Sequence, residues 1–300
     1  MQRNEFLKTL LGVAGVTAFG LPSIASSSSG KKKLPVGAHV WVYAKHQPGF
    51  DVSPILPQIF SDMKYAGLDS VETMEHPLRK NETTKIIAEL IEQHQLPLIG
   101  TSYGADIWNR AKHSEILEDV ENIMENMKKL NARTFGTSVG RPSGRMKTED
   151  ELDAQAELLT KMIAIGKKNG IVLNLHNHTY EVENNLFDLS GTLKRIPDVK
   201  LGPDLNWLLR ANVDPVEFLK KYSDNIVFMH LRDQLSNGKW PESLGEGNTD
   251  FEKIGDTLDE IKFHGDLIIE LAHENGFQPT RPIRESLKMS REHIRKTMGY

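Results

Sequence analysis

Four apolar runs in this sequence each end in a side chain that can bind a metal ion or carry a proton. In the segment IVLNLHNHTYE, two imidazoles, His176 and His178, follow such a run directly. Three later runs end at Asp204, His230 and Glu270. Two carboxylates balance the charge of a divalent cation, and this mixture of oxygen and nitrogen ligands suits Mn²⁺, Zn²⁺, Co²⁺ or Fe²⁺ better than Ca²⁺. We therefore expect one metal site formed by His176, Asp204, His230 and Glu270.

Each of these residues also has a simpler interpretation when it is taken alone. A single histidine at the end of a strand, His39 included, is often a hydrogen-bonded structural group. An aspartate before a loop, such as Asp204, often caps the next helix. Glu270 follows three apolar residues, and a buried carboxylate needs either a cation or an arginine as its partner. The joint occurrence of four polar residues, each closing its own apolar run, favours the metal site.

Short apolar runs suited to buried parallel strands alternate with segments of helical spacing from residue 34 to the C-terminus. The expected strands cover residues 36–42, 70–73, 96–101, 134–138, 171–176, 199–204, 226–231 and 266–270. The expected helices cover residues 54–66, 83–94, 116–130, 151–169, 215–222, 251–261 and 283–298. Eight repeats favour an α/β fold of the closed (β/α)₈ type, the TIM barrel, over an open sheet with a glycine-rich dinucleotide turn.

The carboxyl ends of the strands form one face of such a barrel, so residues far apart in the sequence should meet there. Glu72 closes the second expected strand and is interpreted either as a supporting acid or as one side of an ion pair with a helix. Residues 244–251, LGEGNTDF, form either a loop that closes over a substrate or a plain turn.

Several motifs in the second half carry a resemblance to a known family. The segments LHNHTYE, DLNWLLRANVDPVEFLKKY, IVFMHLRDQ, LGEGNTDF and LIIELAHEN follow the order and spacing of a subgroup with an H-N-H-x-x-E strand end, a D-x-x-W segment and an H-[VL]-[KR]-D segment. From about residue 34 onward the chain resembles the xylose isomerase-like barrel superfamily of sugar phosphate isomerases and epimerases. The resemblance implies metal ligands after strands five to eight, which here are His176, Asp204, His230 and Glu270.

Two departures from the family pattern bear on the chemistry. His176 stands where relatives with a two-glutamate site have a glutamate, and Trp207 replaces a histidine that many relatives have. In the two-glutamate relatives one glutamate removes a proton beside the carbonyl and the other returns it, through an enediolate. This chain keeps only Glu270, so His176 or His178 could take the second proton role. The same enolate also permits β-elimination or hydration, so a lyase or hydrolase acting on 3-keto-glycosides is the alternative to an isomerase or epimerase.

Further residues are expected to support the reaction. Arg232 is suited to holding a substrate oxygen by a forked pair of hydrogen bonds, with Asp233 orienting it. Glu181 and Asn177 are expected to orient the histidines. The catalytic residues are expected to be Glu270, His178 and His176. Substrate contacts are expected from His39, Asn177, Trp207, Arg232 and Trp240.

Composition excludes some classes of partner, and the resemblance implies a small carbohydrate as the substrate. The 300 residues carry a formal net charge of -4 and no cysteine, which argues against nucleic acid and excludes a thiolate metal site. A related multi-zinc endonuclease would need more ligands and a basic cleft, both of which are missing. A non-catalytic sugar-binding barrel is the remaining alternative, and a homo-oligomer is compatible with the sequence. An unphosphorylated substrate is favoured because no basic loop follows strands seven and eight.

The first 25 residues are typical of an export signal, with Arg3 and Lys8 ahead of an apolar stretch and small residues at 23 and 25. The order RNEFLK resembles a twin-arginine signal in which Asn4 replaces the second arginine, so the Sec route stays open. We expect a disordered linker over residues 26–33, a catalytic domain over residues 34–300, a periplasmic location, and no stable membrane insertion after cleavage.

Overall fold

The structure is a computed structural model and describes residues 34–300. The export signal expected over residues 1–25 and the linker expected over residues 26–33 lie outside this described part. Among the helices of residues 34–300, none is both long enough and apolar enough to cross a membrane.

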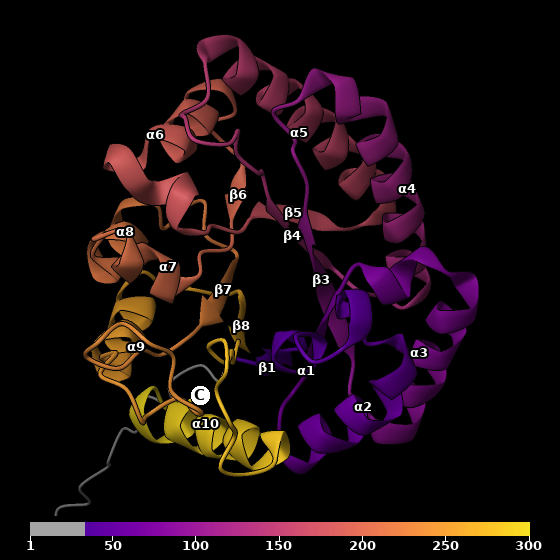
Figure 1. The fold of residues 1–300 in the computed structure, drawn as a ribbon, viewed down its shortest axis with the longest axis vertical. Helices are drawn as coiled ribbons and strands as arrows, with labels where there is room; N and C mark the ends of the chain where they lie inside the picture. Colours follow the sequence, from indigo (N-terminus) through magenta and orange to yellow (C-terminus); the bar gives the residue numbers. More distant parts are fainter. Residues whose placement is uncertain (1–33) are drawn as a thin grey trace, which may run out of the picture. The chain divides into compact units, whose positions relative to one another are not determined.

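Eight parallel strands form the centre of the fold (Figure 1). Their ladder runs in the order β6-β5-β4-β3-β2-β1-β8-β7, and parallel bridges from Leu201 to Ile226 and from Asp204 to His230 connect its two ends. The result is a nearly closed barrel, which confirms the expected (β/α)₈ fold. The strands are β1 (Val36–His39), β2 (Val71–Met74), β3 (Leu98–Gly104), β4 (Thr134–Ser138), β5 (Val172–Leu175), β6 (Lys200–Leu201), β7 (Phe228–Leu231) and β8 (Asp266–Ile269).

Helices connect the strands and lie outside them in Figure 1. The seven expected helices are all present, with ends that differ from the expected ones by three residues or fewer. The α-helices are α1 (Trp41–Ala44), α2 (Leu56–Tyr65), α3 (Asn81–His94), α4 (His113–Lys129), α5 (Glu149–Asn169), α6 (Thr179–Arg195), α7 (Leu205–Arg210), α8 (Pro215–Lys221), α9 (Phe251–Glu260) and α10 (Ile283–Thr297).

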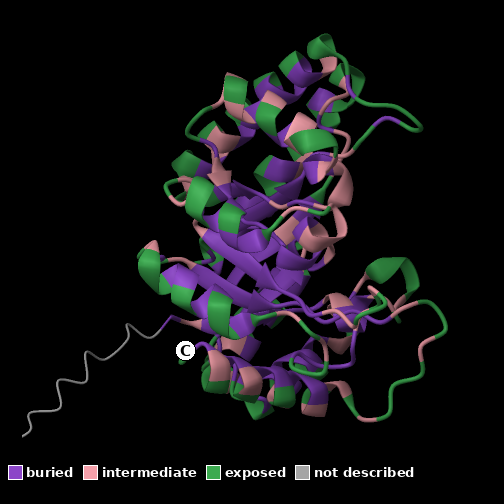
Figure 2. Cartoon of the chain, turned by 90° about the vertical axis from the view of Figure 1, so that its left-hand side faces the viewer, coloured by how far each residue is buried: buried purple, intermediate pink, exposed green. Residues whose placement is uncertain are grey.

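The strands and the inner faces of the helices make up the core, and the exposed residues lie mostly on the outer faces of the helices (Figure 2). Helix α4 shows how the sequence produces this arrangement. Ile116, Val120, Ile123 and Met127 are spaced by three or four residues, and all four are buried. This spacing keeps one apolar stripe on the barrel while the charged residues of the helix stay in water.

Some boundaries differ from the expected ones for local reasons. The first strand ends at His39 rather than at residue 42, because the Trp41 N–H turns back to donate to His39 Nδ1 at 3.1 Å and α1 begins there. Strand β6 has only two residues, and Asp204 lies beyond it as the N-cap of α7. Helix α6 was not expected, and it is interrupted at Glu183–Leu186, where three successive residues have positive φ.

Candidate active site and metal centre

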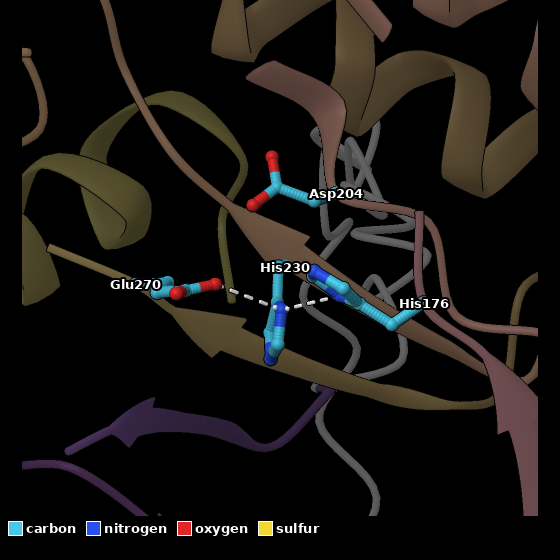
Figure 3. Close-up of side chains that lie close together, drawn as sticks. All are labelled: His176, Asp204, His230 and Glu270. Carbon is cyan, nitrogen blue, oxygen red and sulfur yellow. Dashed lines mark hydrogen bonds and ion pairs between the residues drawn. The ribbon is translucent and has the colours of Figure 1, made fainter. Parts of the chain in front are cut away.

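Four side chains from four consecutive strand ends converge at the mouth of the barrel (Figure 3). His176 follows β5, Asp204 caps α7 after β6, His230 lies in β7, and Glu270 follows β8. Each offers one ligand atom, and these atoms all lie within 4.8 Å of one another. All four residues are buried. The structure therefore brings together the four residues that the sequence indicated as metal ligands.

Backbone pairing at the strand ends sets this geometry. The parallel bridge between Asp204 and His230 places two of the four residues side by side. The Glu270 N–H donates to the carbonyl of Leu231 at 3.0 Å, and the His176 N–H donates to the carbonyl of Thr137 at 2.9 Å. Each functional side chain is thus held by a backbone that belongs to the barrel ladder rather than by a free loop.

His230 lies at the centre of the cluster. Its Nδ1 is 3.1 Å from Nδ1 of His176 and 2.9 Å from Oε2 of Glu270. Its Nε2 lies 2.5 Å from Oε2 of Glu72, which is itself fully buried. Burial alone would lower the pKa of His230, but the carboxylates of Glu72 and Glu270 outweigh burial and raise that pKa to about 10.

Glu72 has the position of a supporting acid, one of its two sequence interpretations. A carboxylate that accepts the Nε2–H of an imidazole fixes the ring and leaves Nδ1 as the atom that can bind a metal. That Nδ1 is the atom that faces His176 and Glu270. Because β1 and β2 pair in register at His39 and Glu72, the barrel itself places this carboxylate beneath the cluster.

The donor set of the cluster indicates that these residues fit a divalent cation. Asp204 Oδ1 accepts the N–H groups of Asn206 and Trp207, so this residue does cap a helix as its position suggested. Its other oxygen, Oδ2, is buried and lies 3.3 Å from Arg232 Nε, and Oε2 of Glu270 is buried 2.9 Å from Nδ1 of His230. Burial raises the pKa of the Asp204 carboxyl, against the opposing effect of Arg232. Two buried acceptor oxygens beside two imidazole nitrogens form a donor set that a divalent cation satisfies.

Arg232 is buried against the same cluster. Its Nη2 contacts Oε1 of Glu270, and its Nε lies 3.3 Å from Oδ2 of Asp204. Trp207 and Trp240 lie on its guanidinium with ring centroids 5.4 and 5.0 Å from Cζ. Burial tends to raise the pKa of Glu270, but Arg232 and then His230 outweigh it and hold that pKa well below its usual range. Glu270 is therefore ionised at neutral pH.

The expectation that Asp233 orients Arg232 is wrong. Its Oδ1 accepts the N–H groups of Gln234 and Thr249, and its Oδ2 accepts those of Gly245 and Gly247. A Cβ added at Gly247 would meet Oδ1 of Asp233 at 2.3 Å, so a glycine is required there. The carboxylate thus organises the LGEGNTDF segment around itself, which favours a fixed loop over one that swings closed.

Asn177 does not line the cavity at the barrel mouth. Its Nδ2 donates to the carbonyl of Asp204 at 3.3 Å, and its Oδ1 accepts the N–H of Asp204 at 3.1 Å. Both amide groups of the side chain are used in this way, so the structure does not support the expected substrate contact. Asn177 instead positions Asp204 from the neighbouring strand end.

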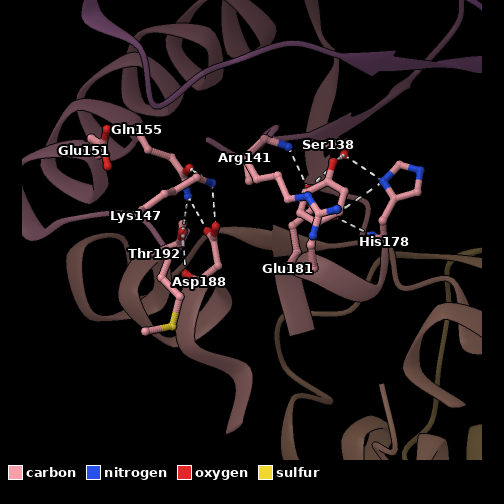
Figure 4. A network of polar contacts seen from close by, with 12 residues as sticks. Ser138, Arg141, Lys147, Glu151, Gln155, His178, Glu181, Asp188 and Thr192 are labelled. Carbon is pink, nitrogen blue, oxygen red and sulfur yellow. Dashed lines mark hydrogen bonds and ion pairs between the residues drawn. The ribbon is translucent and has the colours of Figure 1, made fainter. Parts of the chain in front are cut away.

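His178 belongs to a second polar network beside the cluster (Figure 4). Ser138 Oγ donates to Oε1 of Glu181 at 2.8 Å and lies 2.9 Å from both Nδ1 of His178 and the hydroxyl of Tyr180. Because a hydroxyl has one hydrogen and a carboxylate can only accept, the neutral imidazole donates its Nδ1–H to Ser138. This tautomer leaves Nε2 of His178 with a free lone pair.

The surroundings of His178 suit a proton carrier. Its side chain is 38% exposed, and its ring stacks on Tyr180 at 5.5 Å and contacts Trp207 at 5.4 Å. Burial would lower the pKa of His178, but Glu181 at 3.5 Å, with a smaller contribution from Glu270, outweighs burial and raises it. The expected orienting role of Glu181 agrees with this contact and with its hydrogen bond from the His178 backbone N–H at 2.5 Å.

A cavity of about 1670 Å³ opens over the cluster. His39 lies in its wall, where Nε2 is 2.8 Å from Ser102 Oγ and Nδ1 is 3.8 Å from Oε1 of Glu270. The residues that line this end of the cavity include His39, His176, His178, Trp207, His230, Arg232, Trp240 and Glu270.

Sequence reasoning missed Ser138 and Tyr180, and it left Glu72 undecided. Ser138 ends a strand that the sequence did predict, so its position at the active face was available as a signal. Tyr180 had no such signal, because it lies in the first turn of α6, a helix that was not expected.

Comparisons with known proteins agree with this architecture. Residues 60–293 match the model of the family described as xylose isomerase-like TIM barrel. A curated relative, inosose dehydratase of Clostridium perfringens, is 28% identical over a 172-residue alignment that covers 49% of this chain and 55% of the relative. The chain thus spans about half the length of the curated relatives that it matches.

Two solved structures share the fold at low sequence identity. A D-allulose 3-epimerase from Methylomonas sp. in complex with D-allulose has a TM-score of 0.72 and 15% identity, with 89% of this chain and 98% of that chain covered. A 3-keto-D-glucoside 4-epimerase from E. coli has a TM-score of 0.68 and 17% identity, with 87% and 100% covered. Together with the family match over most of the sequence, they support one conclusion. The chain belongs to the xylose isomerase-like TIM barrel family.

Proposed function

We propose that this protein is a divalent-metal-dependent enzyme that removes a proton beside the carbonyl of an unphosphorylated keto-sugar, as an isomerase or epimerase does. The observation that carries the proposal is the convergence of His176, Asp204, His230 and Glu270, whose ligand atoms all lie within 4.8 Å of one another at the mouth of the barrel.

The four clustered side chains would hold the ion through two nitrogens and two oxygens. When bound, a divalent cation supplies positive charge that stabilises negative charge on a substrate oxygen. Glu72 would keep the His230 ring in place, and Asn177 would keep Asp204 in place, through the hydrogen bonds described above. The metal is proposed to be Mn²⁺, Zn²⁺, Co²⁺ or Fe²⁺.

The geometry favours different roles for the three expected catalytic residues. Glu270 is held ionised by Arg232 and lies within the cluster, which favours a role as ligand over a role as base. His176 is also turned into the cluster, with Nδ1 facing His230. His178 lines the cavity, has a free Nε2, and is held by Ser138 and Glu181. We therefore propose His178 as the group that exchanges a proton with the substrate.

A second candidate outcome, a lyase or hydrolase that acts on 3-keto-glycosides, also has a specific observation in its favour. The matched curated relative is a dehydratase, an enzyme that eliminates water. Elimination needs a proton at the leaving group rather than a second base for the carbon. One imidazole beside the cluster, in place of a second glutamate, suits either outcome. The enolisation step is common to both.

Export also forms part of the proposal. It is supported by the charged and apolar pattern of residues 1–25, and it is the reason for proposing an unphosphorylated substrate. Detection of the protein in a periplasmic fraction, with its N-terminus at residue 26, would test this part separately.

The reaction is tested by proton exchange in D₂O, followed by NMR for a panel of free ketoses and 3-keto-glycosides. We expect deuterium to enter beside the carbonyl when Mn²⁺ or Co²⁺ is present, and exchange to stop when EDTA is added. Net epimerisation would identify the first outcome, and loss of water or of the aglycone would identify the second. Metal-loaded protein that binds sugars without exchange or product would instead be a sugar-binding barrel.

His178→Ala separates the proposed proton carrier from the ligands. This variant should lose most of its exchange rate, by about 10²–10⁴-fold, and keep its metal. Equal losses of metal and rate would make His178 a ligand instead. His94→Ala serves as the matched control, because His94 lies at the end of α3 and does not line the cavity.

A further inference from the structure

The cavity over the metal cluster is larger than one sugar ring requires. Its volume of about 1670 Å³ exceeds the range of roughly 300–1,000 Å³ that is usual for pockets of small ligands. The cluster and its two tryptophans, Trp207 and Trp240, occupy the side formed by the ends of β6, β7 and β8. Much of the remaining lining comes from segments that follow β1, β2 and β3, with further residues from the ends of β4 and β5. The cavity therefore has a second part next to the proposed reaction centre.

An aromatic pair forms one wall of this second part. Trp41 and Phe50 stack at 5.4 Å with an interplanar angle of 28°, and both line the cavity. Trp41 is joined to the reaction centre through His39, because its backbone N–H donates to His39 Nδ1, which lies 3.8 Å from Glu270. In the order of the sheet, β8 separates this pair from Trp207 and Trp240. Two pairs of aromatic side chains thus flank the strand that ends in Glu270.

The backbone of Phe50 is strained, and burial of its side chain does not compensate for that strain. Its side chain is 46% exposed, and its backbone has φ of 60°, directly after Gly49 with φ of 62°. For a residue with a side chain, the left-handed region is energetically unfavourable, because the Cβ crowds the following carbonyl oxygen. Little buried area offsets that cost, because nearly half of the ring remains in water. A strained, exposed aromatic residue in the wall of a cavity is more consistent with ligand binding than with folding.

Polar groups that can bind sugar hydroxyls line the same cavity. Arg79 donates to both oxygens of Asp119 at 2.9 and 2.8 Å, and its Nη1 lies 3.7 Å from Glu75. All three residues line the cavity and come from the segments after β2 and β3, which follow β1 in the sheet. A cavity that offers both an apolar ring face and charged hydrogen-bonding groups suits a pyranose, which has apolar C–H faces and hydroxyl edges.

We propose that Trp41 and Phe50 form a binding subsite for a second sugar ring, so that the substrate is a glycoside of at least two rings rather than a free monosaccharide. The choice of a keto-glycoside rests on the proposed function, because the reacting ring is the one placed at the metal cluster. The binding of a second ring does not rest on it. The two ideas can therefore fail separately.

The test is a binding measurement on protein treated with EDTA, which removes any contribution from catalysis. Isothermal titration would compare methyl α- and β-glucoside with the disaccharides trehalose, maltose, cellobiose and lactose. We expect at least one disaccharide to bind at least tenfold more tightly than either methyl glucoside. Stacking that buries about 60 Å² of apolar ring surface corresponds to roughly that factor.

Variants connect this preference to the aromatic pair. Phe50→Ala and Trp41→Ala should each remove the preference for the disaccharide and leave the affinity for the methyl glucoside within about twofold of the wild type. Phe50→Trp keeps an aromatic ring at this position and should keep the preference for the disaccharide. Tyr65→Ala is the matched control, because Tyr65 is 49% exposed on α2 and does not line the cavity. Its preference should be unchanged.

Three results would overturn the subsite. The first is that no disaccharide binds more tightly than the methyl glucosides. The second is that the preference for a disaccharide survives in Phe50→Ala. The third is that Phe50→Ala changes only the self-association of the protein, as measured by analytical ultracentrifugation. Absence of exchange in D₂O for every keto-sugar would instead refute the proposed function, and it would leave the disaccharide preference as the measure of the subsite.

Discussion

Replacing Glu72 with glutamine should weaken metal binding without unfolding the protein. Glu72 and His230 are both buried, and their Oε2 and Nε2 atoms are 2.5 Å apart. The Glu72→Gln side chain has nearly the same size and can still accept the Nε2–H through its amide oxygen. What it loses is the negative charge that makes this hydrogen bond roughly twice as strong as a neutral one.

The expected size of the effect follows from the position of Glu72 behind a ligand. Changes to carboxylates that orient a metal-bound histidine typically weaken metal affinity by about 10–100-fold, or roughly 1.4–2.7 kcal/mol. Glu72→Ala removes the acceptor altogether and should lie at or beyond the upper end of that range. The affinities for Mn²⁺ and Zn²⁺ would be measured by competition with a chelating dye, and circular dichroism would check the fold.

Glu75→Gln is the matched control, because it is the same substitution three residues away on a side chain that does not belong to the cluster. Its metal affinity should stay within about twofold of the wild type. If Glu72→Gln and Glu72→Ala, both folded, also bind metal as tightly as the wild type, then Glu72 does not orient His230 and the reasoning is wrong.

Two further predictions concern stability and would be measured by urea denaturation. Asp233→Ala removes the acceptor of four backbone N–H groups and should lower the free energy of unfolding by about 2–4 kcal/mol, with new protease cleavage in residues 244–249. The control Asp250→Ala removes a single helix cap and should lower it by about 1 kcal/mol. Equal losses in the two variants would contradict the role of Asp233 in organising the loop. Lys147→Ala leaves the buried carboxylate of Asp188 without its cation and should lower the free energy of unfolding by about 3–5 kcal/mol. Lys161→Ala breaks an exposed pair with Glu157 and should have a much smaller effect. A small effect at Lys147 would show that other groups compensate the charge of Asp188.

The fold was predictable from the sequence because its signal is repeated and local. Each buried strand is a short apolar run, and a helix such as α4 carries its stripe at regular spacing. Two of the helices that the sequence did not predict are irregular or short. Helix α6 contains three successive residues with positive φ, and α7 has only six residues that begin at an aspartate cap.

The four clustered residues were predictable because each one closes its own strand. Their partners were harder to assign, because orientation depends on tertiary contacts. Asn177 lies between two histidines in the sequence, yet its amide turns to the backbone of Asp204. Asp233 follows Arg232 directly, yet its carboxylate belongs to the loop of residues 244–251. Neighbours in sequence at a strand end point in different directions, and only the structure shows which direction each one takes.

The most direct test of the account is the metal content of purified protein after equilibration with Mn²⁺ or Zn²⁺ and removal of free ion. The account predicts one ion per chain in the wild type and in the control His94→Ala. It predicts loss of that ion in folded His230→Ala and Asp204→Asn variants. A wild type without bound ion, or variants that retain it at full occupancy, would contradict the claim that these four strand ends form one metal site.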